Sequence, residues 1–583
     1  FTNGLTATAG TPPSSITQHG NLLSDGNVAL DATTTIDFDG TVGATTAIGE
    51  NFNIGTNTTT ANVDLADAVS VDGLISITGA NVTIGGAVRA DANSAGNEAL
   101  TISATNTAAS DLNVNNILTT NTGAITLSAK DDIIFAAAGD LASNNGNVLV
   151  TADSDNTAAG SGGALTMADG TTINAGSGTI TMSADENIAL GGLTTTNATG
   201  AAVAITSDNG SITDAGDTDV DITASAANSV VTLSAKDTIG AVSGDAVYLD
   251  PGDTGYAGNP LETAILSLSA TTSASSGSEI AIDNTSASGL ALTTLQPGGA
   301  GNVGSAWIRN SAALDVSGIT INNTNFPGDK LAFIATTGNL TVQDIGTTPL
   351  NVGTAGVLKL EAPAGDVTET GANDNLSVTA QDFILKSGTS ETVSLAVTNF
   401  DAQITGTGND LAATQATGDL IVKNLDGSGD KAFTKDAAIY AEGGASITTS
   451  NGSQNLNDGI FANTEALALS IAGAGKGLNV APTTDAYVRA ASGIDIDVVD
   501  GNVNFGTADG RSVDLAVSAG NLTLDVNTPT AVRAITFGDD DSNDVTTLLV
   551  EGDVTIRNDG VGDTGAVVNF AGTIDFKKDS SLT

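Results

Sequence analysis

The chain has 583 residues, no cysteine and 3% aromatic residues, and 66 acidic against 17 basic side chains give a net charge of −49. This charge argues against nucleic acid, whose phosphates need a basic face, and against an anionic membrane surface. The lack of cysteine excludes a disulfide framework and cysteine-based metal sites. Apolar residues form 40% of the chain, mostly in ordered alternation, which argues against disorder of the bulk.

Residues 1–60 are predicted to form the N-terminal entry segment that leads into the solenoid, together with its first coils. They open with FTNGLTATAG, which lacks an initiator methionine and a signal-like apolar run, so we expect a mature product or a fragment. His19, the single histidine, lies in the polar segment SSITQHGN and is expected in a surface loop. No apolar run approaches the roughly 18 residues of a membrane span, so no membrane insertion is expected.

A short alternating strand after a glycine recurs along the chain. The pattern G-[N/D]-[V/L]-x-apolar begins at Gly26, Gly146, Gly338, Gly418, Gly501, Gly520 and Gly552. Glycine is expected to supply a positive φ, and Asn or Asp to bond to its own backbone. Alternation then places Val, Leu and Ile inside and Thr or Ser outside.

Residues 61–250 carry the most regular repeats. Related strands begin near Leu100, Ile125, Val148, Ile180 and Val203, with steps of about 23 to 25 residues and one of about 32. Short strands inside a longer unit are typical of a solenoid whose coil holds two or three strands. We therefore predict an all-β fold, an elongated right-handed parallel β-helix with about 23 residues per coil.

Two near-copies, ITLSAKDDI and VTLSAKDTI, place Lys130 and Lys236 at the same point of the repeat. A third copy, ITMSADENI, keeps the strand but has Asp185 where the lysine stood. The apolar frame persists while the charge changes, so we expect Leu127 and Leu233 to face inward and the lysines to mark a corner.

Residues 251–310 gather proline and glycine and are predicted to be a junction or an inserted loop, before a second solenoid section over 311–583. The aromatic residues Tyr248, Tyr256 and Trp307 are candidate binding contacts, because aromatic side chains carry much of the energy at interfaces. The alternative left open is that Trp307 fills a core.

Clusters of carboxylates suggest calcium, which prefers oxygen ligands. DAGDTDVDI holds Asp214 and GDDDSNDV holds further acids, and neither matches an EF-hand loop. The candidate ligands are Asp217, Asp219, Asp221, Asp539, Asp541 and Asp544. A solvated acidic face is the alternative. No cofactor is expected to be required, and calcium is the candidate ion.

No catalytic residues are predicted, and we expect no enzyme. A Ser/His/Asp triad could form only around His19. Enzymes of the parallel β-helix class combine clustered acids with Lys or Arg, but the first 250 residues hold two Lys and one Arg. A polysaccharide-active β-helix is the least favoured alternative.

Segments such as GAITLSAKDDIIFAAAGDLASNNGNVLVTA and GTITMSADENIALGGLTTTNATGAAVAITS resemble the repeat regions of filamentous-haemagglutinin-like exoproteins and related giant bacterial surface proteins. The resemblance covers most of 61–250 and, more loosely, the chain after Gly318. It implies an exported, elongated surface protein used in adhesion, fibre building or coat formation.

The favoured function is therefore an extracellular structural protein at a bacterial surface, with its signal removed, forming a fibre, stalk or coat layer. Self-association end to end or side by side is expected, because solenoid ends present unpaired strand edges. Divalent cations and surface glycans are further candidate partners. The alternative is an adhesin that presents a binding loop on a β-solenoid stalk.

Overall fold

The fold is described from a computed structural model, and it is all-β. The strands stack in parallel into a β-solenoid of about 14 turns with about 26 residues per turn. This confirms the predicted fold class, although the turns are longer than the predicted 23 residues. No helix occurs among the described residues, and hence none that is long and apolar enough to cross a membrane.

The structure describes the following residues: 5–7, 12–38, 45–55, 61–93, 96–105, 109–154, 162–216, 219–242, 258–274, 277–299, 301–344, 350–353, 355–371, 375–387, 391–404, 411–413, 415–416, 420–424, 433–435, 439–441, 445–449, 453–456, 459–462, 466–474, 477–480, 486–490, 493–500, 502–505, 513–518, 521–526, 533–537, 545–550, 553–558, 566–570 and 573–576. Contacts divide them into two units, one ending at Ile308 and the other beginning at Arg309.

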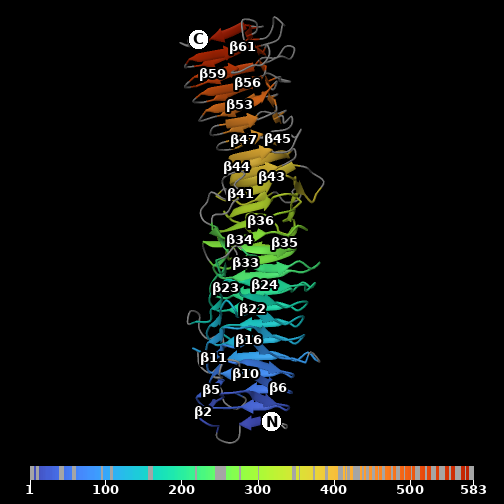
Figure 1. Ribbon diagram of the computed structural model, residues 1–583. Helices are drawn as coiled ribbons and strands as arrows, with labels where there is room; N and C mark the ends of the chain where they lie inside the picture. The colour runs from blue at the N-terminus through green and yellow to red at the C-terminus, as the bar shows by residue number, and fades with distance from the viewer. Residues whose placement is uncertain are drawn as a thin grey trace. The chain divides into compact units, whose positions relative to one another are not determined.

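Most turns of unit 1 contribute strands to three parallel ladders, whose stacked arrows Figure 1 shows. Ladder 1 consists of β1 (Leu5–Ala7), β4 (Val28–Leu30), β7 (Phe52–Ile54), β10 (Ile75–Gly79), β13 (Leu100–Ala104), β16 (Ile125–Ala129), β19 (Val148–Thr151), β22 (Ile180–Ala184), β25 (Val203–Ser207), β28 (Val231–Ala235), β33 (Ser267–Thr272) and β35 (Leu290–Gln296). Ladder 2 consists of β2 (Ser15–Thr17), β5 (Thr35–Phe38), β8 (Asn62–Leu65), β11 (Val82–Ile84), β14 (Leu112–Val114), β17 (Ile133–Phe135), β20 (Leu165–Met167), β23 (Ile188–Leu190), β26 (Ile212–Asp214) and β29 (Thr238–Ile239). Ladder 3 consists of β3 (Leu22–Ser24), β6 (Thr45–Ile48), β9 (Ala68–Val71), β12 (Val88–Arg89), β15 (Leu118–Thr119), β18 (Leu141–Ala142), β21 (Thr172–Asn174), β24 (Gly192–Thr195), β27 (Ile222–Ala224) and β32 (Leu261–Ile265).

Alternation builds the core, because β-branched and aliphatic side chains of successive turns lie directly above one another. In ladder 1, Leu127 pairs in register with Ile102 before it and with Val150 after it, and all three are fully buried. The column continues through Met182, Ile205 and Leu233. The predicted strand positions and the inward direction of Leu127 and Leu233 are therefore confirmed.

Corner insertions explain the longer turns. The register partner of Ile125 is Val148, after about 23 residues, but the partner of Val148 is Ile180, after about 32. Val231 pairs with Leu268, after about 37 residues. Since the strands keep their length and pairing, the additional residues lie between strands.

The glycine that precedes a ladder 1 strand allows close approach between turns. A Cβ on Gly146 would lie 2.1 Å from the carbonyl oxygen of Gly123, and a Cβ on Gly178 would lie 2.1 Å from that of Gly146. Neither Gly146 nor Gly178 has a positive φ. The expected positive φ is therefore wrong at these two positions, although both glycines end tight turns, with Gly146 N–H donating to the carbonyl oxygen of Ser143 and Gly178 N–H to that of Ala175. Glycine is needed there because the stacked backbones leave no room for a side chain.

Most of the described part of 251–310 continues the solenoid. Ladder 1 runs directly from β28 to β33, and β34 (Ser278–Asn284) pairs with both β29 and β32, so ladders 2 and 3 merge in one strand. β30 (Ala241–Val242) pairs antiparallel with β31 (Gly258–Asn259). Residues 243–257 between these two strands lie outside the described residues, and we call this segment the insertion. β36 (Gly304–Asn310) follows. The ladders therefore change at β34, and the predicted junction or inserted loop over 251–310 stays a prediction.

Unit 2 repeats the parallel architecture. Its first strands are β37 (Leu314–Asp315), β38 (Lys330–Ala335), β39 (Leu340–Val342), β40 (Leu350–Asn351), β41 (Val357–Ala362) and β42 (Val367–Glu369). The long strands β43 (Asn375–Ser387) and β44 (Glu391–Ile404) pair with each other along most of their length. β45 (Leu411–Ala413) and β47 (Leu420–Asn424) both pair with β44, so one long strand gives way to two shorter ones.

Three ladders follow in unit 2. The first continues from β47 through β50 (Ala445–Thr449), β53 (Leu467–Ala474), β56 (Ile494–Asp500), β59 (Leu522–Val526) and β62 (Val554–Asn558). The second consists of β46 (Gln415–Ala416), β49 (Ile439–Ala441), β52 (Gly459–Ala462), β55 (Ala486–Ala490), β58 (Val513–Val517), β61 (Val545–Val550) and β64 (Thr573–Phe576). The third consists of β48 (Phe433–Lys435), β51 (Gln454–Leu456), β54 (Leu478–Val480), β57 (Val503–Phe505), β60 (Arg533–Phe537) and β63 (Ala566–Phe570).

Candidate functional site

Side-chain oxygens of Asn and Asp link successive turns at the corners. Before ladder 1 strands, Asn27 Oδ1 accepts a hydrogen bond from the N–H of Asn51, and Asn51 Oδ1 accepts one from Leu74. Asn147 Oδ1 accepts one from Thr179 at 3.0 Å. The expected bond to the residue's own backbone is therefore not the one formed, because the acceptor reaches the N–H of the next turn.

A second column of this kind runs before the strands of ladder 2 and includes acidic residues. Asn81 Oδ1 accepts a hydrogen bond from the N–H of Asp111 at 2.9 Å, and Asp111 Oδ1 accepts one from Asp132 at 3.3 Å. Asp132 Oδ1 in turn accepts one from Ala164 at 2.8 Å. A carboxylate here has a structural function as a hydrogen-bond acceptor.

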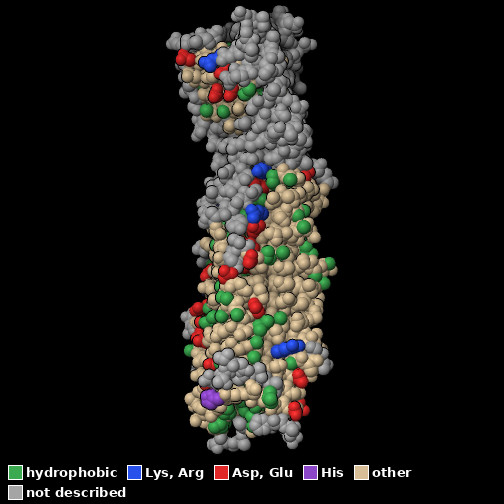
Figure 2. Space-filling model, in the orientation of Figure 1, with side chains coloured by type: hydrophobic (Ala, Val, Ile, Leu, Met, Phe, Trp, Pro, Cys, Tyr) green, Lys and Arg blue, Asp and Glu red, His purple; other side chains and the backbone are tan. Residues whose placement is uncertain are grey.

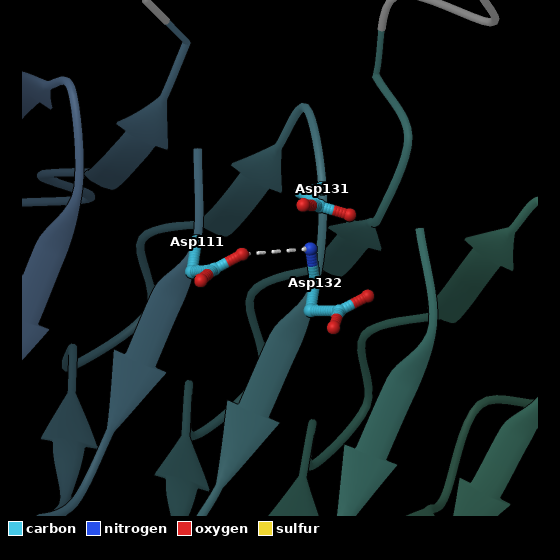
Figure 3. A group of neighbouring side chains, drawn as sticks. All are labelled: Asp111, Asp131 and Asp132. Atoms are coloured by element: carbon cyan, nitrogen blue, oxygen red, sulfur yellow. Dashed lines mark hydrogen bonds between the residues drawn. The ribbon is translucent and has the colours of Figure 1, made fainter. Parts of the chain in front are cut away.

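Asp111, Asp131 and Asp132 form the first of two acidic groups among the described residues (Figure 3). One carboxylate oxygen from each lies within 4.8 Å of the others, and all three side chains are half-buried. Burial, followed by the charges of Asp132 and Asp111, raises the pKa of Asp131 above 3.8. Two members of this group already serve the corner column, so their proximity follows from the stacking.

Asp214, Asp221 and Glu262 form the second group, which is buried. They are 6%, 2% and 7% exposed, and one carboxylate oxygen of each lies within 4.8 Å of the others. Asp214 ends β26, Asp221 immediately precedes β27, and Glu262 lies in β32, the neighbour of β27 in the next turn. The group therefore joins two turns at one corner of the solenoid.

Backbone hydrogen bonds hold this group in place. The N–H of Glu262 donates to Asp221 Oδ2 at 2.9 Å, and the N–H of Asp221 donates to the carbonyl oxygen of Glu262 at 2.8 Å. Asp214 Oδ1 accepts a hydrogen bond from Gly216 at 2.9 Å. Asp214 Oδ2 is buried, and no described residue donates a hydrogen bond to it.

Three carboxylates this close repel one another. Two unit charges about 4.8 Å apart repel by about 3.5 kcal/mol at an effective dielectric constant of about 20. The donor set consists of oxygens alone, which suits a hard divalent cation and does not suit zinc or copper. These residues could therefore hold calcium.

Only part of the predicted site falls within the described residues. Asp221 belongs to the buried group, whereas Asp219 is exposed. Asp217, Tyr248, Tyr256, Asp539, Asp541 and Asp544 lie outside the described residues. Glu262 was missed, because 40 residues separate it from Asp221 and only the register of β27 and β32 brings the two together.

Trp307 is fully buried in β36, which favours the alternative that it fills a core over a role as a surface contact.

The buried pair of Lys359 and Glu361 in β41, with Nζ and Oε1 3.6 Å apart, combines opposite charges within one strand. His19 is exposed. At the SAKD corner, Lys236 Nζ donates to Asn209 Oδ1 at 3.1 Å, a polar contact that supports the corner interpretation.

Comparisons of the chain with family models, with curated proteins and with solved structures found no match.

Proposed function

We propose that the chain is an exported structural protein, a β-solenoid that builds a fibre, stalk or coat layer at a bacterial surface. The observation that carries this proposal is the stacking of like residues in columns: apolar side chains inside, glycines at the turns, and Asn or Asp at the corners. Such columns serve to continue a scaffold from one turn to the next.

The outer surface supports a structural function. Ser and Thr alternate with the buried positions, as in Ser103 and Ser128, whose hydroxyl groups are 2.8 Å apart on neighbouring strands. Figure 2 shows mainly neutral polar side chains and backbone on one face, with apolar and acidic side chains scattered among them. We propose that filamentous-haemagglutinin-like exoproteins are its relatives, on the strength of the repeats.

Electron microscopy and sedimentation of the purified full chain, with calcium and with EDTA, test the scaffold function. We expect assemblies that grow with protein concentration, by end-to-end or side-by-side contact. Particles that remain single chains at high concentration in both conditions would contradict it. A panel of acidic glycans in the same buffers tests for turnover, and product formation would favour a polysaccharide-active enzyme instead.

The hairpin of β30 and β31 favours an adhesin as the second candidate. Its antiparallel pairs, Ala241 with Asn259 and Val242 with Gly258, bring the two ends of segment 243–257 together on a solenoid whose other described strands in this unit pair in parallel. A loop with a closed base can present a binding surface without interrupting the ladders.

Replacement of 243–257 by a short glycine-serine linker tests this candidate, because it spares β32 to β36, which a deletion of 250–310 would remove. If the chain is an adhesin, the linker variant should no longer bind its target surface. The control, a chain shortened at 155–161 between β19 and β20, should still bind. Equal binding by both variants would contradict the adhesin function.

A further inference from the structure

We propose that Asp214, Asp221 and Glu262 bind one calcium ion, and that this ion fixes the base of the insertion at 243–257. The inference does not depend on the scaffold function, because it concerns binding by a single chain.

The first argument is the environment of Asp214. Its side chain is 6% exposed, and its Oδ2 atom accepts no hydrogen bond from any described residue. A buried carboxylate oxygen without a donor is costly, and a bound cation removes that cost. The half-buried group of Asp111, Asp131 and Asp132 differs, since every one of its members accepts a backbone hydrogen bond from the next turn.

The second argument is the donor set. Three carboxylates supply up to six oxygen atoms, and calcium takes six to eight at irregular angles. Magnesium demands near-octahedral geometry and retains water, so a buried cluster made only of carboxylates favours calcium. A divalent ion also offsets two of the three negative charges.

The position of the group gives the ion its effect. Asp214 and Asp221 belong to one turn, whereas Glu262 belongs to the next and lies three residues after the end of β31. The chain before the insertion packs closely against the start of β32, since a Cβ on Gly240 would lie 2.8 Å from the backbone nitrogen of Leu261. An ion on Glu262 therefore acts at the point where the chain returns from the insertion to ladder 3.

Calcium titration by calorimetry of the EDTA-stripped full chain tests the proposal, with Asp214→Asn, Asp221→Asn and Glu262→Gln as variants. Each keeps the size of the side chain, and Asp221→Asn keeps an oxygen for the N–H of Glu262. We expect the calcium affinity of one site to fall by about tenfold or more in each variant. Asp208→Asn, an exposed change of equal charge six residues before Asp214, should leave it unchanged.

Thermal unfolding separates a metal site from a hydrogen-bonded acidic cluster. In EDTA, Asp214→Asn should melt above the unsubstituted chain because repulsion is relieved, and in calcium it should melt below it. Chymotrypsin, which can cut at Tyr248 and Tyr256, should cleave the unsubstituted chain more slowly in calcium, with no such protection in Asp214→Asn. Equal calcium binding by all variants, or no response of the folded chain up to about 10 mM calcium, would overturn the proposal.

Discussion

Asn147 Oδ1 accepts a hydrogen bond of 3.0 Å from the backbone N–H of Thr179, its counterpart one turn later in the chain. The same relationship recurs in unit 2, where Asn339 accepts from Asp366 at 3.1 Å and Asn521 accepts from Asp553 at 3.0 Å. The Asn of the glycine-asparagine motif thus holds the start of the next strand in place.

Asn147→Ala should lower the free energy of unfolding by about 0.5 to 1 kcal/mol, because the N–H of Thr179 loses its acceptor at an exposed corner. Hydrogen exchange at Thr179 should become faster. Asn147→Asp, which retains the acceptor, is the matched control and should leave exchange at Thr179 slow. Unchanged exchange in Asn147→Ala would show that the bond contributes nothing.

Gly146→Ala should cost about 2 kcal/mol or more, since its Cβ would lie 2.1 Å from the carbonyl oxygen of Gly123 and backbone must move. Urea unfolding measures the loss. Gly200→Ala is the control, because a Cβ there meets no atom within 4 Å and its φ is not positive. Equal midpoints for the two variants would refute the close-approach argument.

Leu127→Ala should destabilise the solenoid by about 2 to 4 kcal/mol, because it opens a cavity in a column whose neighbours, Ile102 and Val150, cannot collapse without breaking register. Thr126→Ala, on the outward side of the same strand, should stay within about 0.5 kcal/mol. Denaturant unfolding compares them. Similar losses for both would indicate that the strand is not anchored by its inner face.

Asp131→Asn should stabilise the protein near pH 7, because it removes a charge that burial and the neighbouring carboxylates disfavour. The gain should be less than about 1 kcal/mol, because solvent screens the charges at this corner. The folded pKa of Asp131 is raised, so the folded state holds the proton more tightly than the unfolded chain. Stability therefore falls as the pH rises from 3.8 through the folded pKa, and the penalty persists above it.

Unfolding midpoints between about pH 4 and pH 7, measured in EDTA, test this. The unfolding midpoint of Asp131→Asn should fall less steeply with rising pH than that of the unsubstituted chain. The midpoint of the exposed control, Asp208→Asn, should follow that of the unsubstituted chain. Parallel curves for all three proteins would contradict the raised pKa.

The strands and the core could be predicted because alternation is local: Ile125, Leu127 and Ala129 reveal their inward direction within five residues. The functions of Gly146 and Asn147 could not be predicted from the sequence, since the residues that they contact are defined only by the register between turns. The same limit applied to the acidic group. Asp214 and Asp221 are near in sequence, but Glu262 follows an insertion, and no short motif marks it.

The pairing of each turn with its immediate neighbour has a consequence for how the chain acquires its structure. On average a strand pairs with one about 26 residues earlier, whatever the total length. The search for a partner is therefore short at every step, and relative contact order falls as turns are added. A turn can dock on its predecessor as soon as its own residues have been synthesised and are free to pair. Lengthening the protein by whole turns should then leave the rate of adding each turn unchanged.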